Sequence, residues 1–216
     1  MKAILFVSAF LCALSATLAA ETIGPWSLDQ LFEAPRMRWE DRSGPVHSLI
    51  YQGEPVKGAD TEVFAFYASP STLDPSTKGP FPGVVLIHGG GGTAFPEWAW
   101  LWAQRGYAAI AMDLSGRRPM PPQLDANGVP IANQRGSRTK LAKGGLDHTH
   151  VEKFDCILTP DTSDDWPYHA AASVIRAHSL LRSFEEVDAE RTAVTGISWG
   201  GYTTCLVASL DSRFKA

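Results

Sequence analysis

Hydrophobic and polar positions along the chain change their period from segment to segment. HSLIYQG (47–53) and TEVFAFYASP (61–70) alternate apolar and polar residues across a short turn, which predicts two antiparallel strands. GVVLIHGGGG (83–92) and YAAIAMDLSG (107–116) instead contain continuous apolar runs, which are typical of strands buried on both faces.

Two segments have helical character. PEWAWLWAQR (96–105) opens on a proline and is followed by Gly106, which predicts a helix with a proline at its start and a glycine cap at its end. YHAAASVIRAHSLLRSF (168–184) predicts a second, longer helix before another short apolar strand. Because strands and helices alternate, the sequence predicts an α/β fold: a mostly parallel sheet with helices on both faces.

Two other segments follow neither period. Residues 21–46 have no firm pattern and are expected to form a leader that packs on the main domain, residues 47–216. Residues 117–167 are rich in Pro, Gly, Asn and Asp. That stretch is too long for an ordinary connection, so we expect an insertion or lid beside the active site.

The first twenty residues hold one lysine and then an apolar run that ends in small residues. This pattern predicts a secretory signal peptide cleaved after Ala20, and hence a secreted or periplasmic protein. The alternative is a membrane anchor, but the run is shorter than the roughly 20 residues that span a bilayer.

Charge and cysteine content exclude several classes of partner. The net charge is −4 and no Lys/Arg cluster occurs, so we expect neither nucleic acid nor, after signal cleavage, a membrane as partner. Cys156 and Cys205 would remain after cleavage and allow at most one disulfide, although Cys205 lies in an apolar helical run and is expected to be buried and free. No cofactor is expected, and the oligomeric state is left open.

The stretch VTGISWGGY (194–202) carries the clearest chemistry. It places a G-x-S-x-G pattern between a short strand and an apolar run of helical length, the context of a nucleophile elbow. Gly196 and Gly200 stand where a side chain would collide with the strand or the helix. We therefore expect Ser198 to be a nucleophile and the amide of Trp199 to stabilise developing negative charge.

HGGGG (88–92) directly follows a buried strand. A phosphate-binding loop is one interpretation, but no Lys-Ser/Thr follows the glycines and the G-x-G-x-x-G spacing is absent. A flexible linker is another, yet linkers do not join a core strand to a helix. We favour an oxyanion loop, in which amides near Gly89 and Gly90 act together with that of Trp199, and His88 braces the loop.

The HGGGG loop, the strand YAAIAMDLSG and the elbow GISWGG together resemble the α/β-hydrolase superfamily over roughly residues 60–216. WPYH before the long helix and GISWGGY are similar to secreted acetyl xylan esterases and dienelactone hydrolase-like proteins. The elbow is also similar to that of the prolyl oligopeptidase family. The resemblance implies Ser198 as nucleophile, Trp199 with the HGGGG loop as oxyanion hole, and an acid and a histidine further along the chain.

The chain departs from that pattern after Ser198. It contains no later histidine, and its only later acid is Asp211, which we interpret as a residue that ends the helix. We therefore expect that the acid and the histidine of the triad are not in this chain. On this view the 216 residues are the N-terminal part of a longer protein and are inactive alone.

The histidines upstream of the elbow offer no clear substitute. His148 and His150 form an H-x-H pair that could bind a metal, but no third ligand is evident and we expect no metal site. His169 and His178 lie on the predicted helix before the elbow, where helix-surface positions suit them.

Tryptophans raise the question of sugar binding. Trp98 and Trp102 share a helix face with four-residue spacing, which favours packing against the sheet over sugar stacking. Trp166, at the end of the insertion, is the better candidate for a substrate contact.

Three functions fit the sequence. The first is a secreted esterase that hydrolyses carboxylic esters, with acetyl groups on carbohydrate as the expected substrate, through an acyl-enzyme on Ser198. The second is an exported peptidase of the prolyl oligopeptidase type, although no propeller repeats precede the domain. The third is a non-catalytic remnant, if the natural chain ends at Ala216. The signal, the short N-terminal region and the HGGGG loop favour the esterase, while acetyl and xylan rest on the resemblance alone.

Overall fold

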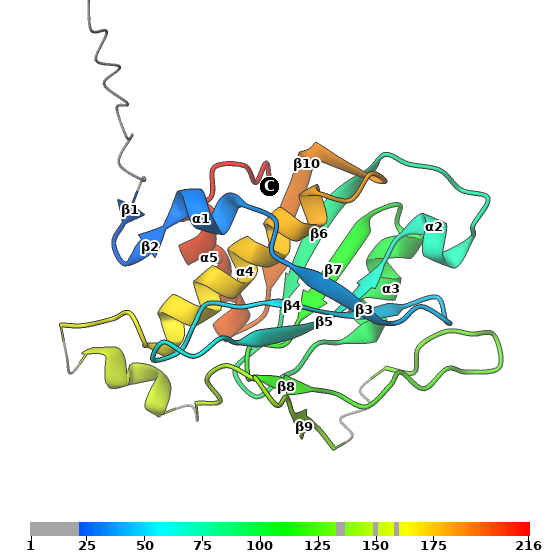
Figure 1. Cartoon of the computed structure of the whole chain (residues 1–216). Helices are drawn as coiled ribbons and strands as arrows, with labels where there is room; N and C mark the ends of the chain where they lie inside the picture. Colours follow the sequence, from blue (N-terminus) through cyan, green and yellow to red (C-terminus); the bar gives the residue numbers. More distant parts are fainter. Residues whose placement is uncertain (1–21, 133–136, 149–150, 158–159) are drawn as a thin grey trace, which may run out of the picture.

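A six-stranded sheet forms the centre of the molecule (Figure 1). The computed structural model describes residues 22–132, 137–148, 151–157 and 160–216, so the predicted signal peptide lies outside it. In spatial order the sheet contains β10 (Val187–Gly196), β6 (Phe81–Ile87), β7 (Ala108–Met112), β5 (Glu62–Ala68), β4 (His47–Gln52) and β3 (Met37–Asp41). β10, β6 and β7 are parallel, and β5, β4 and β3 continue the sheet in antiparallel fashion.

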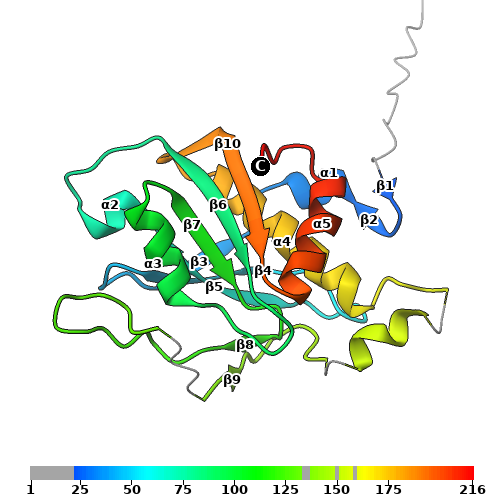
Figure 2. The same cartoon turned by 180° about the vertical axis from the view of Figure 1, so that it is seen from behind.

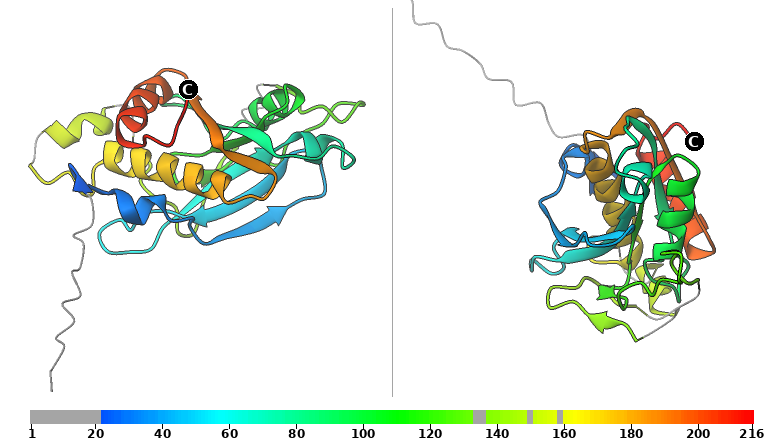
Figure 3. Two further views of the ribbon diagram at one scale, coloured as in Figure 1. Left: turned by 90° about the horizontal axis from the view of Figure 1, so that it is seen from above. Right: turned by 90° about the vertical axis from the view of Figure 1, so that its right-hand side faces the viewer.

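Helices cover both faces of this sheet. They are α1 (Leu28–Phe32), α2 (Pro70–Leu73), α3 (Pro96–Gln104), α4 (Trp166–Arg182) and α5 (Trp199–Leu210). Figure 2 shows α3 in front of the sheet with α4 behind it, and the right-hand view of Figure 3 shows the sheet between these two helices. The predicted α/β architecture is therefore confirmed.

The continuous apolar strands supply two cores at once. Val85 and Ile87 of β6 belong to the core that α4 covers, whereas Val84 and Leu86 belong to the core that α3 covers. Because successive side chains of a strand point to opposite faces, an uninterrupted apolar run is what a strand between two helical layers requires.

The segment 21–46 contributes more than a packed leader. It begins with the short strands β1 (Thr22–Ile23) and β2 (Trp26–Ser27), continues as α1, which packs on α4, and then forms the edge strand β3. In β3 the half-buried Met37 and Trp39 alternate with exposed charged residues. Only one face of this edge strand is covered, so its apolar signal is too weak to stand out in the sequence.

The insertion 117–167 includes the paired strands β8 (Arg117–Arg118) and β9 (Thr139–Lys140) and a 3-10 helix, η1 (Glu152–Ile157). It ends slightly earlier than predicted, because α4 already begins at Trp166. His150, half of the H-x-H pair, lies outside the described residues. Within the described part of the chain, no helix is both long and apolar enough to cross a membrane.

Two expectations about side-chain burial were wrong. His169 and His178 are buried, because α4 is enclosed by the sheet, α1 and α5 instead of presenting a free surface. Cys205 is free but exposed, since α5 packs through the face that carries Thr203 and Val207.

Candidate active site

Ser198 occupies the turn between β10 and α5, at the edge of the sheet where the parallel strands end. Its backbone has φ +59° and ψ −119°, a conformation that is strained for any residue with a side chain. Ser198 is exposed, and it directly precedes the first residue of α5. The fold therefore holds the hydroxyl group in the open, next to the positive end of the helix dipole.

The glycines around Ser198 are required by close backbone contacts. A Cβ atom at Gly196 would lie 2.4 Å from the carbonyl oxygen of Gly200, and one at Gly200 would lie 2.2 Å from that of Ile87. The amide of Ile197 also donates a hydrogen bond of 3.2 Å to the same Ile87 oxygen. The elbow is thus pressed against the end of β6, where only glycine fits.

The HGGGG loop lies directly beside this elbow. A Cβ atom at Gly89 would lie 3.3 Å from Cβ of Ser198, and one at Gly90 would lie 2.4 Å from Cδ1 of Trp199. The loop closes on itself through a 2.9 Å hydrogen bond from the amide of Gly92 to the carbonyl of Gly89. The four residues that the sequence singled out, 89, 90, 198 and 199, are thus brought together by the fold.

His88 links the start of this loop to the neighbouring strand. Its Nδ1 donates to the carbonyl of Gly89 at 2.6 Å, and its Nε2 accepts from the amide of Leu114 at 2.9 Å. This hydrogen-bond pattern assigns the proton to Nδ1 of a neutral ring. Burial lowers the pKa of His88, which favours the same neutral form. With both ring nitrogens bonded to backbone, His88 holds the loop in place.

Two further side chains hold the loop, and sequence reasoning missed both. Asp113 is buried directly after β7, where its carboxylate accepts hydrogen bonds of 2.7 Å from the Thr93 hydroxyl and 2.8 Å from the Ser115 amide. Arg138 donates from Nη1 to the carbonyl of Gly92 at 2.5 Å. The position of Asp113, directly after a buried parallel strand, could have indicated a role at the site. No sequence pattern marks Arg138, because it lies in the irregular insertion.

Aromatic rings surround Trp199. The ring centroids of Phe154, Trp166 and Tyr202 lie 5.2, 5.3 and 5.4 Å from that of Trp199. Trp166 is only 4 % exposed, and its Nε1 donates to the carbonyl of Leu114 at 3.3 Å. The expectation that Trp166 contacts substrate was therefore wrong, because its side chain is buried against the ring of Trp199. Phe154 and Tyr202, in contrast, are exposed.

Asp211 has a larger role than the predicted helix-ending residue. Its carboxylate is fully buried and accepts from Nδ1 of His178 at 2.7 Å and from Nε and Nη2 of Arg213 at 2.8 Å. Nε2 of His178 lies 2.8 Å from the Thr192 hydroxyl. This pair stands at the far end of α5 from Ser198, about 18 Å away for a twelve-residue helix. It cannot serve as the acid and base of Ser198.

A serine on a strained strand-to-helix turn, at the carboxyl edge of a parallel sheet and beside a glycine loop, defines an α/β-hydrolase. The chain belongs to the acetyl xylan esterase family, whose model, described as Acetyl xylan esterase (AXE1), matches residues 44–216. The resemblance seen in the sequence is therefore confirmed.

Several solved structures are similar to this chain. An acetyl xylan esterase from Paenibacillus sp. R4 is 26% identical, with a TM-score of 0.59 over 87% of this chain and 54% of its own. Acetyl xylan esterase 1 from Thermoanaerobacterium sp. JW/SL YS485 is 17% identical, with a TM-score of 0.54 over the same shares of the two chains. A dienelactone hydrolase-like phosphotriesterase from metagenomic libraries is 21% identical, covers 77% and 56%, and has a TM-score of 0.45. The chain thus spans about half the length of these proteins.

Proposed function

We propose that this chain carries the nucleophile and the oxyanion hole of a serine esterase that removes acetyl groups from carbohydrate. The observation that carries the proposal is the strained, exposed turn of Ser198 against the glycine loop at Gly89. A fold accepts such strain where the surrounding structure enforces it, most often at a functional site.

In the proposed reaction, Oγ of Ser198 attacks the ester carbonyl carbon. Amides of Trp199 and of the loop around Gly89 and Gly90 donate to the oxygen that becomes negative, and the N-terminus of α5 adds its positive dipole. The alcohol leaves, an acyl group remains on Ser198, and water then releases it as a carboxylic acid.

Attack also requires a base that accepts the proton of Ser198. His88 and His178 cannot take this role, because both ring nitrogens of each are bonded within the fold. We therefore assign neither His88 nor His178 as the base. Of the catalytic groups, we attribute only the nucleophile and the oxyanion hole to this chain.

Membership of the acetyl xylan esterase family supports acetyl as the acyl group and a xylan-type polysaccharide as the alcohol. Such a substrate lies outside the cell, and the signal-like residues 1–20 suit an exported enzyme. We therefore place the protein in the periplasm or the medium.

A fluorophosphonate probe tests the nucleophile, because it reacts covalently with an activated serine. We expect labelling of Ser198 in the chain joined to any open reading frame that follows codon 216, together with hydrolysis of an activated aryl acetate. Both should disappear in Ser198→Ala. Labelling at another residue, or an active Ser198→Ala variant, would overturn the proposal. Cleavage of a prolyl peptide substrate in preference to the acetate would instead favour the peptidase.

A further inference from the structure

An open cleft lies at the opposite end of the sheet from Ser198. β3, β4 and β5 each contribute to its lining, and α4 ends at Arg182, just before the lining residues Phe184 and Glu186. The cleft has a volume of about 820 Å³ and lies between these strands, the segment that contains α2, and the loop from α4 to β10. That volume is within the range of small-molecule sites, roughly 300–1,000 Å³.

Aromatic rings line the floor of this cleft. The half-buried indole of Trp39 stacks on Phe184 with centroids 5.8 Å apart, and Tyr67 meets Phe184 edge-on at 5.1 Å. The guanidinium of Arg42 lies 5.1 Å from the Trp39 centroid, over the indole. Because Arg42 is exposed, this contact is weak, and a ligand can displace it from the ring.

Hydrogen-bonding groups of both kinds stand beside these rings. The carboxylate of Glu186 accepts a hydrogen bond from the hydroxyl of Tyr67, which fixes its orientation in the cleft. His47 packs edge-on against Trp39 at 5.5 Å and also lines the cleft. Together with Arg42 they offer donors and acceptors next to an apolar platform.

We propose that this cleft binds a pyranose ring of a glycan chain, away from the ester site. A pyranose has apolar C–H faces that pack on aromatic rings and hydroxyl groups at its rim that pair with carboxylate, imidazole and guanidinium. Phe184 and Glu186 lie just before β10, and Ser198 lies just after it. β10 runs beside β6 from Phe81 to Ile87, with a bulge between Asp188 and Thr192, so at about 3.3 Å per residue the two sites lie on the order of 20 Å apart.

The proposal rests on the proposed function in that the substrate is a polysaccharide. A polymer can contact both sites, so the cleft adds a second point of attachment and raises the local concentration of ester groups near Ser198. A small aryl acetate can occupy one site only, and its hydrolysis is independent of the cleft.

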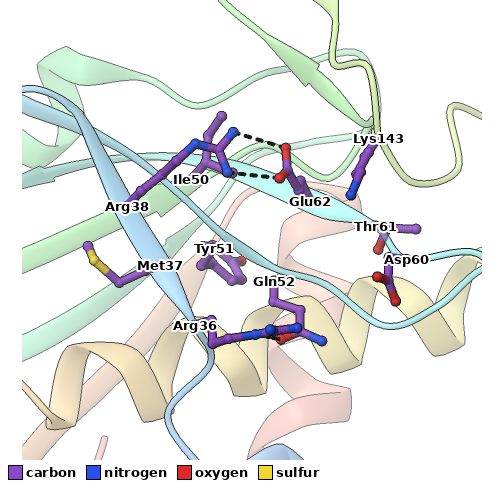
Figure 4. A pocket seen from close by; sticks show the side chains of 10 residues that line it. All are labelled: Arg36, Met37, Arg38, Ile50, Tyr51, Gln52, Asp60, Thr61, Glu62 and Lys143. Carbon is purple, nitrogen blue, oxygen red and sulfur yellow. Dashed lines mark hydrogen bonds and ion pairs between the residues drawn. The ribbon is translucent and has the colours of Figure 1, made fainter.

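A smaller cavity nearby lacks the features that make the cleft suitable for a sugar. It has a volume of about 360 Å³ and lies beside β3, β4 and β5 (Figure 4). Both of its arginines are already bonded to neighbouring side chains: Arg38 donates to Glu62 at 2.8 and 3.1 Å, and Arg36 donates to Gln52 at 3.1 Å. Its one aromatic lining residue, Tyr51, is buried, so no ring offers a stacking platform there.

Titration calorimetry with xylohexaose tests the proposal, since this unacetylated sugar cannot be hydrolysed as an ester. We expect Trp39→Ala and Glu186→Gln each to weaken binding by about 3- to 10-fold. Glu186→Gln keeps an acceptor for the Tyr67 hydroxyl, so it separates lost recognition from lost folding, which thermal melting checks in both variants. Trp100→Ala, which removes a half-buried tryptophan on α3, should leave the affinity unchanged.

Ser198→Ala separates this proposal from the esterase proposal. Xylohexaose should bind Ser198→Ala as it binds the wild type, even though ester hydrolysis is lost. No binding to the wild type, equal affinity of the two cleft variants and the wild type, or binding that disappears in Ser198→Ala would each overturn the cleft as a sugar site. None of these results would affect the labelling of Ser198 on which the esterase proposal depends.

Discussion

Nδ1 of His178 lies 2.7 Å from Oδ2 of Asp211, and both side chains are fully buried. The two residues come from α4 and from the end of α5, and Arg213 completes the cluster by donating to both oxygens of Asp211. Through Nη2, Arg213 also donates to the Ser179 hydroxyl at 2.9 Å. The cluster thus links α4 to the end of α5 through hydrogen bonds of His178 and Ser179 with the charged Asp211 and Arg213.

This cluster makes stability sensitive to acid. Burial lowers the pKa of His178 despite the opposing effect of Asp211, so the folded protein disfavours the protonated ring. Stability should therefore decline as the pH falls below about 6.5, the pKa of unfolded histidine. Burial acts to raise the pKa of Asp211, but hydrogen bonds from Arg213 and His178 outweigh it and hold the pKa well below its usual value. A further decline is thus expected below about pH 4. Urea unfolding at a series of pH values measures both steps.

Removal of the Asp211 charge should be costly. Asp211→Asn leaves Arg213 without its carboxylate partner, and breaking a buried pair in this way costs about 3–5 kcal/mol. Glu190→Gln is the matched control, because Glu190 is 76% exposed in its pair with Arg182 and its loss should change the unfolding free energy by less than about 1 kcal/mol. Equal changes in the unfolding free energy for the two substitutions would show that the buried cluster stabilises the protein no more than an exposed ion pair does.

The close contact of α5 with β6 predicts contrasting effects of two glycine substitutions. In Gly200→Ala the new methyl group would lie 2.2 Å from the Ile87 carbonyl oxygen, so backbone must move and the elbow must deform. We expect a loss of about 1–3 kcal/mol and the loss of probe labelling at Ser198. Gly91→Ala, in the loop beside the elbow, meets nothing within 4 Å and should leave stability nearly unchanged. Labelling that survives in Gly200→Ala would contradict the tight elbow.

Local patterns and long-range contacts differ in how well the sequence predicts them. The buried strands and the elbow follow from apolar runs and from glycine spacing within a few residues, and these were predicted. The pairing of His178 with Asp211 joins positions 33 residues apart, so it depends on how α4 packs against α5. Arg138 reaches the glycine loop from 46 residues away, for the same reason. The exposed position of Cys205 likewise depends on which face of α5 packs inward.

His88 gives a prediction about the oxyanion loop. In His88→Phe the ring no longer accepts the Leu114 amide or donates to Gly89, and the buried amide loses its partner. We expect about 1–3 kcal/mol of destabilisation and a slower reaction of Ser198 with the fluorophosphonate probe. His47→Gln, at the far end of the sheet, should leave that reaction rate unchanged. An unaltered rate in His88→Phe, measured on folded protein, would show that His88 does not position the loop.

The positive φ of Ser198 predicts that replacing this residue by glycine makes the protein more stable while its reactivity is lost. Ser198→Gly relieves the strain of a backbone at φ +59° and ψ −119°, because glycine has no Cβ to collide. We expect the unfolding free energy to rise by about 1 kcal/mol. Ser198→Ala keeps the Cβ and therefore the strain, so its stability should stay close to that of the wild type. Both variants lose the hydroxyl group and should fail to react with the probe. Thermal unfolding of the three proteins side by side measures the difference, and a Ser198→Gly variant no more stable than Ser198→Ala would show that the turn stores no strain.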